Sequence, residues 1–241
     1  MPRYIIRKNG GSVNSTIAGN AVVEAMNNAG IGTGNIDISL ACWVKVSDPV
    51  SLQCPFRIGG PTGGTAQSFL MNEGTLYGAL EYYRSVSNSH AGLQDVVTER
   101  NVWHPNEWMH FILTKDSTLS PFAGSKVYIN GVLVPNKTNT AGTLSLSDTT
   151  PAVCKFDSSP NNFPIQGDCM QVLLYDRILS STEIEDLYYR NIIPTGSKLF
   201  WPLNDGSGST ANDLSSSNND GALAGSAAFS ATDFPERILK P

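Results

Sequence analysis

The chain has 241 residues, of which 40% are hydrophobic and 15% are charged, and its formal net charge is −5. A hydrophobic fraction this high, together with a charged fraction this low, excludes an intrinsically disordered chain. An acidic balance without a Lys or Arg cluster argues against a nucleic-acid partner, and the sequence has no apolar stretch of the roughly 18 residues that cross a bilayer.

The first predicted strand covers residues 36–46, where apolar residues recur at every second position. A period of two places them on one face, so the pattern predicts a strand that buries one face. Cys42 belongs to that face and is expected to be a small buried thiol. Further short strands are predicted between turn-forming clusters, at residues 55–58, 67–71, 76–83, 108–114 and 170–175.

A hairpin is predicted over residues 126–134, because Asn130-Gly131 accepts the positive φ values of a tight turn and β-branched residues flank it. One short helix is predicted near residues 181–190. Ser180 and Glu183 fit a capping box at its start, and Ile184, Leu187 and Tyr188 form the apolar stripe that follows.

Many short strands with a single helix favour an all-β fold, an antiparallel β-sandwich of the jelly-roll type. The length suits one domain over residues 1–241. Four cysteines, at positions 42, 54, 154 and 169, leave open two disulfides or four free thiols.

Three segments in chain order resemble the laminin G-like (LamG) domains of the concanavalin A-like lectin/glucanase superfamily, which are common in bacterial and phage proteins. They are the strand ISLACWVK at residues 38–45, the pair NEWMHF and KVYINGV at 106–111 and 126–132, and QGDCMQVLLYDRILS at 166–180 followed by Glu183-Ile184. The resemblance implies a concanavalin A-like jelly roll with its core at residues 36–190.

The segment LFWPLNDGSG, which begins at Leu199 and leads to Asp220-Gly221, resembles the first strand and loop of the family, although here it comes last. We expect residues 197–225 to complete the sandwich in a permuted order; a remnant of a second copy is the alternative. Residues 1–35 and 226–241 are then expected to be peripheral arms.

The sequence predicts no catalytic residues. Glycoside hydrolysis needs two carboxylates about 5–9.5 Å apart, and enzymes of this fold carry E-x-D-x-E on one strand. The best counterpart here begins at Asp168, whose next positions on the same face are expected to be Met170 and Val172. Neither of these two side chains is an acid.

Calcium is the one cofactor that the sequence offers. Ca²⁺ takes six to eight oxygen ligands, commonly from a loop, and residues 213–221 are rich in oxygen-bearing side chains. Some LamG-like proteins bind calcium at a comparable place. The predicted ligands are Asp213 and Asp220, with Asp168 as a third; an ordinary surface turn has the same composition.

Aromatic side chains in or near loops could stack on sugar rings. Tyr82, Tyr83, Trp103 and Phe163 are therefore the predicted glycan-binding residues. Trp43, Trp108 and His110 are instead assigned to packing, since most large aromatic side chains belong to the core.

The predicted function is a non-enzymatic structural or adhesive protein of a virion, such as a phage capsid decoration or fibre subunit. Its partners would be other structural subunits, surface glycans or further copies of itself. The first residues lack the apolar run of about 7–15 residues of a secretory signal, which favours assembly in a host cytoplasm. The alternative is a secreted, extracellular carbohydrate-binding module; a glycan-processing enzyme ranks third.

Overall fold

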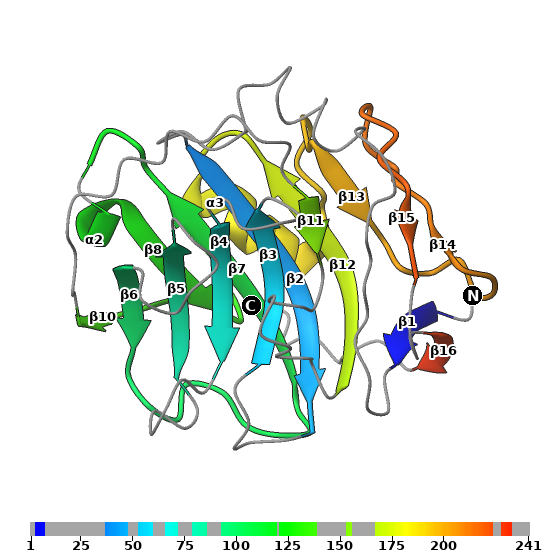
Figure 1. The fold of residues 1–241 in the computed structure, drawn as a ribbon, viewed down its shortest axis with the longest axis horizontal. Coiled ribbons are helices and arrows are strands. Elements are labelled where there is room, and N and C mark those ends of the chain that lie inside the picture. The colour runs from blue at the N-terminus through cyan, green and yellow to red at the C-terminus, as the bar shows by residue number, and fades with distance from the viewer. Residues whose placement is uncertain are drawn as a thin grey trace.

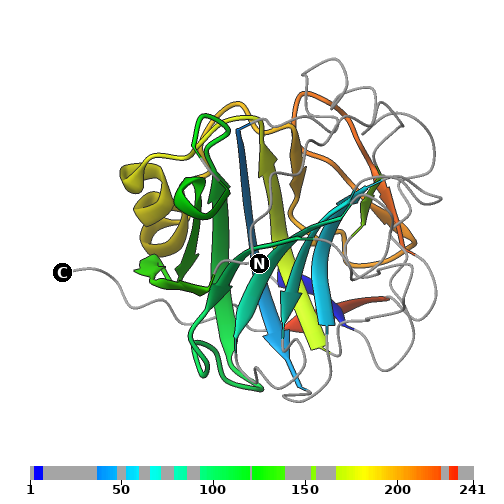
Figure 2. The same ribbon diagram turned by 60° about the vertical axis from the view of Figure 1, so that its left-hand side comes forward.

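The computed structural model describes residues 3–7, 37–47, 53–59, 66–71, 79–85, 93–119, 121–138, 153–155, 167–223 and 228–232. Two antiparallel sheets pack face to face as a β-sandwich (Figures 1 and 2). The predicted all-β fold class is therefore confirmed. Among the described helices, none is long and apolar enough to cross a membrane.

The larger sheet has eight strands, of which seven follow one path and β13 pairs with β12 beside it. The path order is β16 (Ala228–Thr232), β1 (Arg3–Arg7), β12 (Gly167–Tyr175), β2 (Ile38–Val46), β7 (Trp108–Lys115), β8 (Ser125–Ile129) and β9 (Val132–Val134), and β13 is Leu199–Trp201.

The six-stranded sheet has the order β10 (Asn136–Thr138), β6 (Leu93–Thr98), β5 (Leu80–Ser85), β4 (Ala66–Met71), β3 (Gln53–Gly59) and β11 (Val153–Lys155). The remaining described elements are α2 (Pro121–Gly124), α3 (Ser181–Glu185), the π-helix η1 (Asp186–Arg190), and the paired strands β14 (Thr210–Ala211) and β15 (Gly221–Ala222).

The alternation in β2 points its apolar side chains into the core between the two sheets. Ile38, Leu40, Cys42, Val44 and Val46 all belong to this core, together with Met71 and Leu80 of the other sheet. Cys42 is free and buried, as expected, and burial raises the pKa of its thiol.

The expectation that β2 buries only one face is wrong, because its other face is covered as well. Ala41 and Trp43 are buried on the outer side of the larger sheet, where α3 and η1 pack. Figure 2 shows this helix outside the sandwich, as a third layer on one side. The period of two therefore predicts which side chains of β2 point into the core. The outer face is buried as well because the helix packs against it.

The predicted helix is confirmed, with a change of type halfway. Ser180 and Glu183 form the capping box at the start of α3, and the second half, η1, is a π-helix. It ends at Asn191, which adopts a left-handed conformation with φ 56°.

The predicted hairpin is also confirmed. Asn130 and Gly131 have φ values of 50° and 77°, and β8 pairs with β9 across them. A Cβ at Gly131 would lie 3.0 Å from Cδ1 of Tyr188. Both the turn and the packing against η1 therefore require glycine here.

A bulge in β12 overturns one prediction about its faces. Gln171 has φ 50°, and the pairing with β2 shifts register between Met170 and Leu173. Because a bulge inserts one residue, it reverses the alternation beyond it. Met170 stays on the outer face, whereas Val172 points into the core between the sheets.

Both ends of the chain contribute strands to the larger sheet. β1 pairs with β16 over five residues and with β12 through Ile6 and Arg7. Parts of the segments expected to be peripheral arms thus pair within the sheet. In the C-terminal region, β13 pairs with β12 next to β1, and β14 and β15 form a separate pair.

Candidate functional site

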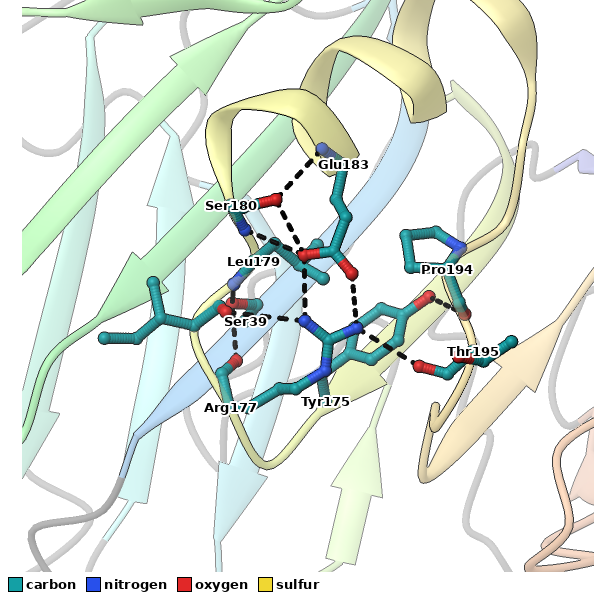
Figure 3. Close-up of polar contacts among 9 residues, drawn as sticks. Ser39, Tyr175, Arg177, Leu179, Ser180, Glu183, Pro194 and Thr195 are labelled. Atoms are coloured by element: carbon teal, nitrogen blue, oxygen red, sulfur yellow. Dashed lines mark hydrogen bonds and ion pairs between the residues drawn. The ribbon is translucent and has the colours of Figure 1, made fainter.

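A network of polar contacts fixes the start of α3 on the outer face of the larger sheet (Figure 3). Nη1 of Arg177 donates to Oε2 of Glu183 at 2.9 Å, and Nη2 donates to Oε1 at 2.6 Å. The backbone N–H and the hydroxyl of Ser180 also donate to Oε2, at 2.9 and 3.0 Å. The hydrogen bonds from Arg177 are the main reason that the pKa of Glu183 is lowered from 4.5 to about 2.

Two further side chains join this network to the sheet. The buried Ser39 hydroxyl donates to the carbonyl of Arg177 at 2.7 Å and accepts from the N–H of Leu179 at 2.9 Å. The Tyr175 hydroxyl donates to the carbonyl of Pro194 at 3.0 Å. Burial is the main cause that raises the pKa of Tyr175. The network therefore orients the helix on the sheet.

An aromatic cluster lies where the helix ends. The ring of Trp43 lies 4.8 Å from His110 and 5.6 Å from Tyr188, measured between centroids. Tyr188 meets Tyr189 edge-on at 4.7 Å. His110 is buried, as the assignment to packing expected, and so is Trp43. The half-buried rings of Tyr189 and Trp108 pack against the edge of this cluster.

Beyond the cluster, three side chains form a row across the outer face. Lys45 of β2 lies opposite Trp108 of β7 on one side and Asp168 of β12 on the other. Residues that are directly opposite in antiparallel strands share a face. The row of Trp108, Lys45 and Asp168, hereafter the Lys45 row, therefore combines an indole, an ammonium and a carboxylate, and Arg7 of β1 lies opposite Asp168 on its other side.

The C-terminal loop is organised around the carboxylate of Asp213. Its Oδ1 accepts from the N–H groups of Phe200 at 2.8 Å and Ser215 at 2.9 Å. Its Oδ2 accepts from the Ser215 hydroxyl and from the N–H of Asn219, both at 2.7 Å. A carboxylate offers about four lone-pair sites, so protein donors occupy the whole capacity of Asp213.

Of the three predicted calcium ligands, Asp213 and Asp220 lie together in the structure and Asp168 lies apart from them. The N–H of Phe200 donates to Asp213, and Phe200 pairs with Leu173 of β12. Asp168 lies five positions from Leu173 along the same strand, so roughly 15 Å of strand separates Asp168 from Asp213. Asp220 does lie beside Asp213, with Oδ1 accepting from the Asp213 N–H at 2.8 Å. Among the described residues, no three His, Cys, Asp or Glu side chains gather to hold a metal.

The saturated carboxylate of Asp213 does not fit a calcium ligand. Two other oxygens in this loop, Oδ2 of Asp205 and Oδ1 of Asn219, are buried without a hydrogen-bond partner in the described part of the chain. Calcium binding at the loop therefore stays a prediction, and Asp213 is better explained as a structural residue.

The predicted glycan-binding residues fall into three groups. Trp103 is 5% exposed and belongs to the core between the sheets, so the prediction of an accessible ring is wrong there. The loop before β7 folds this indole inward. Tyr82 and Tyr83 lie in β5 of the six-stranded sheet, but their side chains are outside the described part. Phe163 is wholly outside the described residues.

Sequence reasoning missed one feature of the outer face. Arg177 lies within the family-like segment, two positions before Leu179, but its partner Glu183 is predicted only as part of the capping box. The assignment of Trp108 to packing agrees with the structure, because its half-buried ring packs against the cluster of Trp43, Met170 and Tyr188.

A family model of the concanavalin A-like lectin/glucanase superfamily matches residues 18–185, more than half of the chain. The chain belongs to this superfamily. Its resemblance to LamG-like domains over the segments around residues 38–45, 106–132 and 166–184 is thereby confirmed. No curated protein sequence matches this superfamily member.

Solved structures share the fold at low identity. A candidate carbohydrate-binding protein from Bacteroides ovatus superposes with a TM-score of 0.62 at 14% identity, over 98% of this chain and 62% of the other. This chain thus spans less than two thirds of that protein. The CBM40 domain of the Ruminococcus gnavus IT-sialidase, bound to α2,3-sialyllactose, gives a TM-score of 0.51 at 14% identity, over 76% and 94% of the two chains.

A third similar structure is a heptameric SAP-like pentraxin from Limulus polyphemus. It has a TM-score of 0.53 at 12% identity, over 84% of this chain and 90% of the pentraxin. At such identities the likeness establishes the lectin-like fold, and function has to be argued from this chain's own residues.

Proposed function

We propose that this chain is a non-catalytic carbohydrate-binding domain. The observation that carries the proposal is the sandwich it shares with a carbohydrate-binding module that holds sialyllactose. The candidate carbohydrate-binding protein from Bacteroides ovatus supports the same class of ligand. Because both structures are 14% identical to this chain, the glycan itself has to be found by experiment.

The outer face of β12 supports binding rather than hydrolysis. Cleavage of a glycosidic bond uses two carboxylates about 5–9.5 Å apart. β12 carries one acid, Asp168, and the bulge at Gln171 turns Val172 to the opposite face. We expect no release of reducing sugar from a panel of polysaccharides; hydrolysis of any member would contradict a non-catalytic role.

A glycan array probed with the purified full chain tests the binding function. The array is run in calcium and in EDTA, and each positive glycan is then titrated by calorimetry. We expect saturable binding to at least one class of glycan. A chain that melts cooperatively and yet binds none of the glycans would overturn the proposal.

A virion subunit in contact with other structural proteins stays a prediction from the sequence. It is compatible with glycan binding, since an adhesive virion protein can use the same fold. Light scattering after size exclusion tests the expected self-association: a defined oligomer supports the subunit, and a monomer at all concentrations favours the isolated binding module.

A further inference from the structure

The four cysteines of the chain lie on four strands, two in each sheet. Cys42 of β2 and Cys169 of β12 belong to the larger sheet. Cys54 of β3 and Cys154 of β11 belong to the six-stranded sheet. Figure 1 shows β2 beside β12 and β3 beside β11. The register of these two strand pairs therefore determines which cysteines are close enough to bond.

Cys42 and Cys169 are diagonal neighbours in the centre of the larger sheet. Cys169 lies directly opposite Val44, two positions from Cys42. Diagonal positions on antiparallel strands are about 7–8 Å apart, beyond the Cα separation of about 4.4–6.8 Å that a disulfide usually spans. Both residues are thiols buried in the core between the sheets, and they are 0% and 3% exposed. The native register thus brings the two thiols near each other without joining them.

Cys54 and Cys154 are farther apart, although their strands are paired. Cys154 lies opposite Ile58, four positions along β3 from Cys54. Four residues of strand span about 13 Å. The irregularity in β3 between Gln53 and Phe56 shortens this span by at most about one residue step, to roughly 10 Å. The backbone pairing alone therefore excludes a disulfide between these two cysteines.

We propose that the native chain is a thiol protein, in which no two of the four cysteines form a disulfide. Pairs between the two sheets are excluded as well, because both cysteines of the larger sheet are thiols. The proposal does not depend on the proposed function. It selects four thiols over two disulfides, the alternatives that the cysteine count leaves open.

Oxidation of the core pair would change the register of the central strands. Because Cys169 faces Val44, β12 has to slide by two residues along β2 before Cys169 lies opposite Cys42. Such a slide keeps every side chain on its own face, but it separates Met170 from Trp43, on which the helix packs. A disulfide between Cys42 and Cys169 should therefore destabilise the chain.

The folded core protects these thiols from oxidants. Burial raises the pKa of the Cys42 thiol, and the thiolate is the form that attacks a disulfide. With oxidised glutathione, two thiols would become one disulfide while the oxidant is reduced to two molecules of glutathione, which take up the two protons. This reaction is expected before β2 and β12 pair. The chain is therefore suited to folding in a compartment that keeps thiols reduced, because an oxidising compartment exposes it to mispairing.

The test refolds the full chain from guanidinium chloride in reduced or in oxidised glutathione. Products are separated without reductant, and the Tm of each is measured by circular dichroism. Each is also unfolded in iodoacetamide, so that mass spectrometry counts its thiols and maps its disulfides. In reduced glutathione we expect the native fold with four alkylated cysteines. In oxidised glutathione, any product with a disulfide between its cysteines should melt at least about 5 °C lower, because the bond strains the register.

Two variants isolate the core pair. Cys54→Ser combined with Cys154→Ser leaves Cys42 and Cys169 as the only cysteines, and adding Cys42→Ala gives a matched control that cannot form their disulfide. Each variant is compared with its own reduced form, so that the loss of a core side chain does not affect the comparison. A native product that keeps its thiols, or a linked product that melts lower, supports the proposal. A disulfide-linked product as stable as the reduced chain would overturn it, whether or not the chain binds a glycan.

Discussion

Replacing Glu183 by Gln tests the claim that its carboxylate holds the helix on the sheet. The side chain accepts two hydrogen bonds from Arg177 and two from Ser180. A pKa lowered from 4.5 to about 2 corresponds to an upper bound of about 3 kcal/mol. Because the Arg177 and Glu183 side chains are 37% and 29% exposed, solvent screens the pair, and we expect a loss of about 1–2 kcal/mol.

The sign of the pH dependence follows from the lowered pKa. A carboxyl that is more acidic in the folded state stabilises the fold above its unfolded pKa, and this contribution disappears as the pH falls toward the folded pKa. For Glu183, the stabilisation should be complete above about pH 5 and should fade between pH 4.5 and pH 2. The difference between wild type and Glu183→Gln should shrink over the same range.

Thermal unfolding followed by circular dichroism measures this difference at several pH values. In a chain of this length, about 1–2 kcal/mol corresponds to a Tm lowered by roughly 2–8 °C near pH 7. Glu107→Gln, at an exposed site in the loop before β7, is the matched control and should melt as the wild type does. A Tm difference for Glu183→Gln that is as large at pH 2.5 as at pH 7 would refute the reasoning.

Three further substitutions test other parts of the fold by thermal unfolding. Ser39→Ala should cost about 2 kcal/mol, because it leaves the buried N–H of Leu179 and the partly buried carbonyl of Arg177 without their bridging hydroxyl; a change below 0.5 kcal/mol would show that the bridge is dispensable. Asp213→Asn should cost about 3 kcal/mol equally in calcium and in EDTA, since four protein donors face the carboxylate, and a calcium-dependent loss would restore the metal hypothesis. Gly131→Ala should cost more than Gly196→Ala, because both have positive φ but only the first would place a Cβ against a tyrosine ring; we expect about 2 and about 1 kcal/mol, and equal losses would contradict the crowding.

Local patterns were sufficient wherever the determining interaction lies within a few residues. The alternation of residues 38–46 oriented β2 correctly, Asn130-Gly131 predicted the hairpin, and the spacing of Ser180 and Glu183 predicted the cap. Each of these depends on backbone geometry or on contacts between near neighbours, which the order of residues encodes directly. The resemblance to LamG-like domains rested on the same segments and was confirmed by the family match.

The tertiary structure decided the features that depend on residues far apart in the chain. The bulge at Gln171 reversed the face of Val172, the loop before β7 buried Trp103, and η1 brought Tyr188 onto Trp43. The partners that saturate Asp213 come from both sides of it, including Phe200 in β13. The sequence fixes which side chains each segment carries. Whether a side chain is exposed, and whether its polar atoms are still free to bind a ligand, depends on the neighbours that it contacts in the folded chain. The sequence by itself therefore determined the sandwich and the orientation of its main strands, while packing between distant segments determined which of its side chains are buried and which polar groups already have partners.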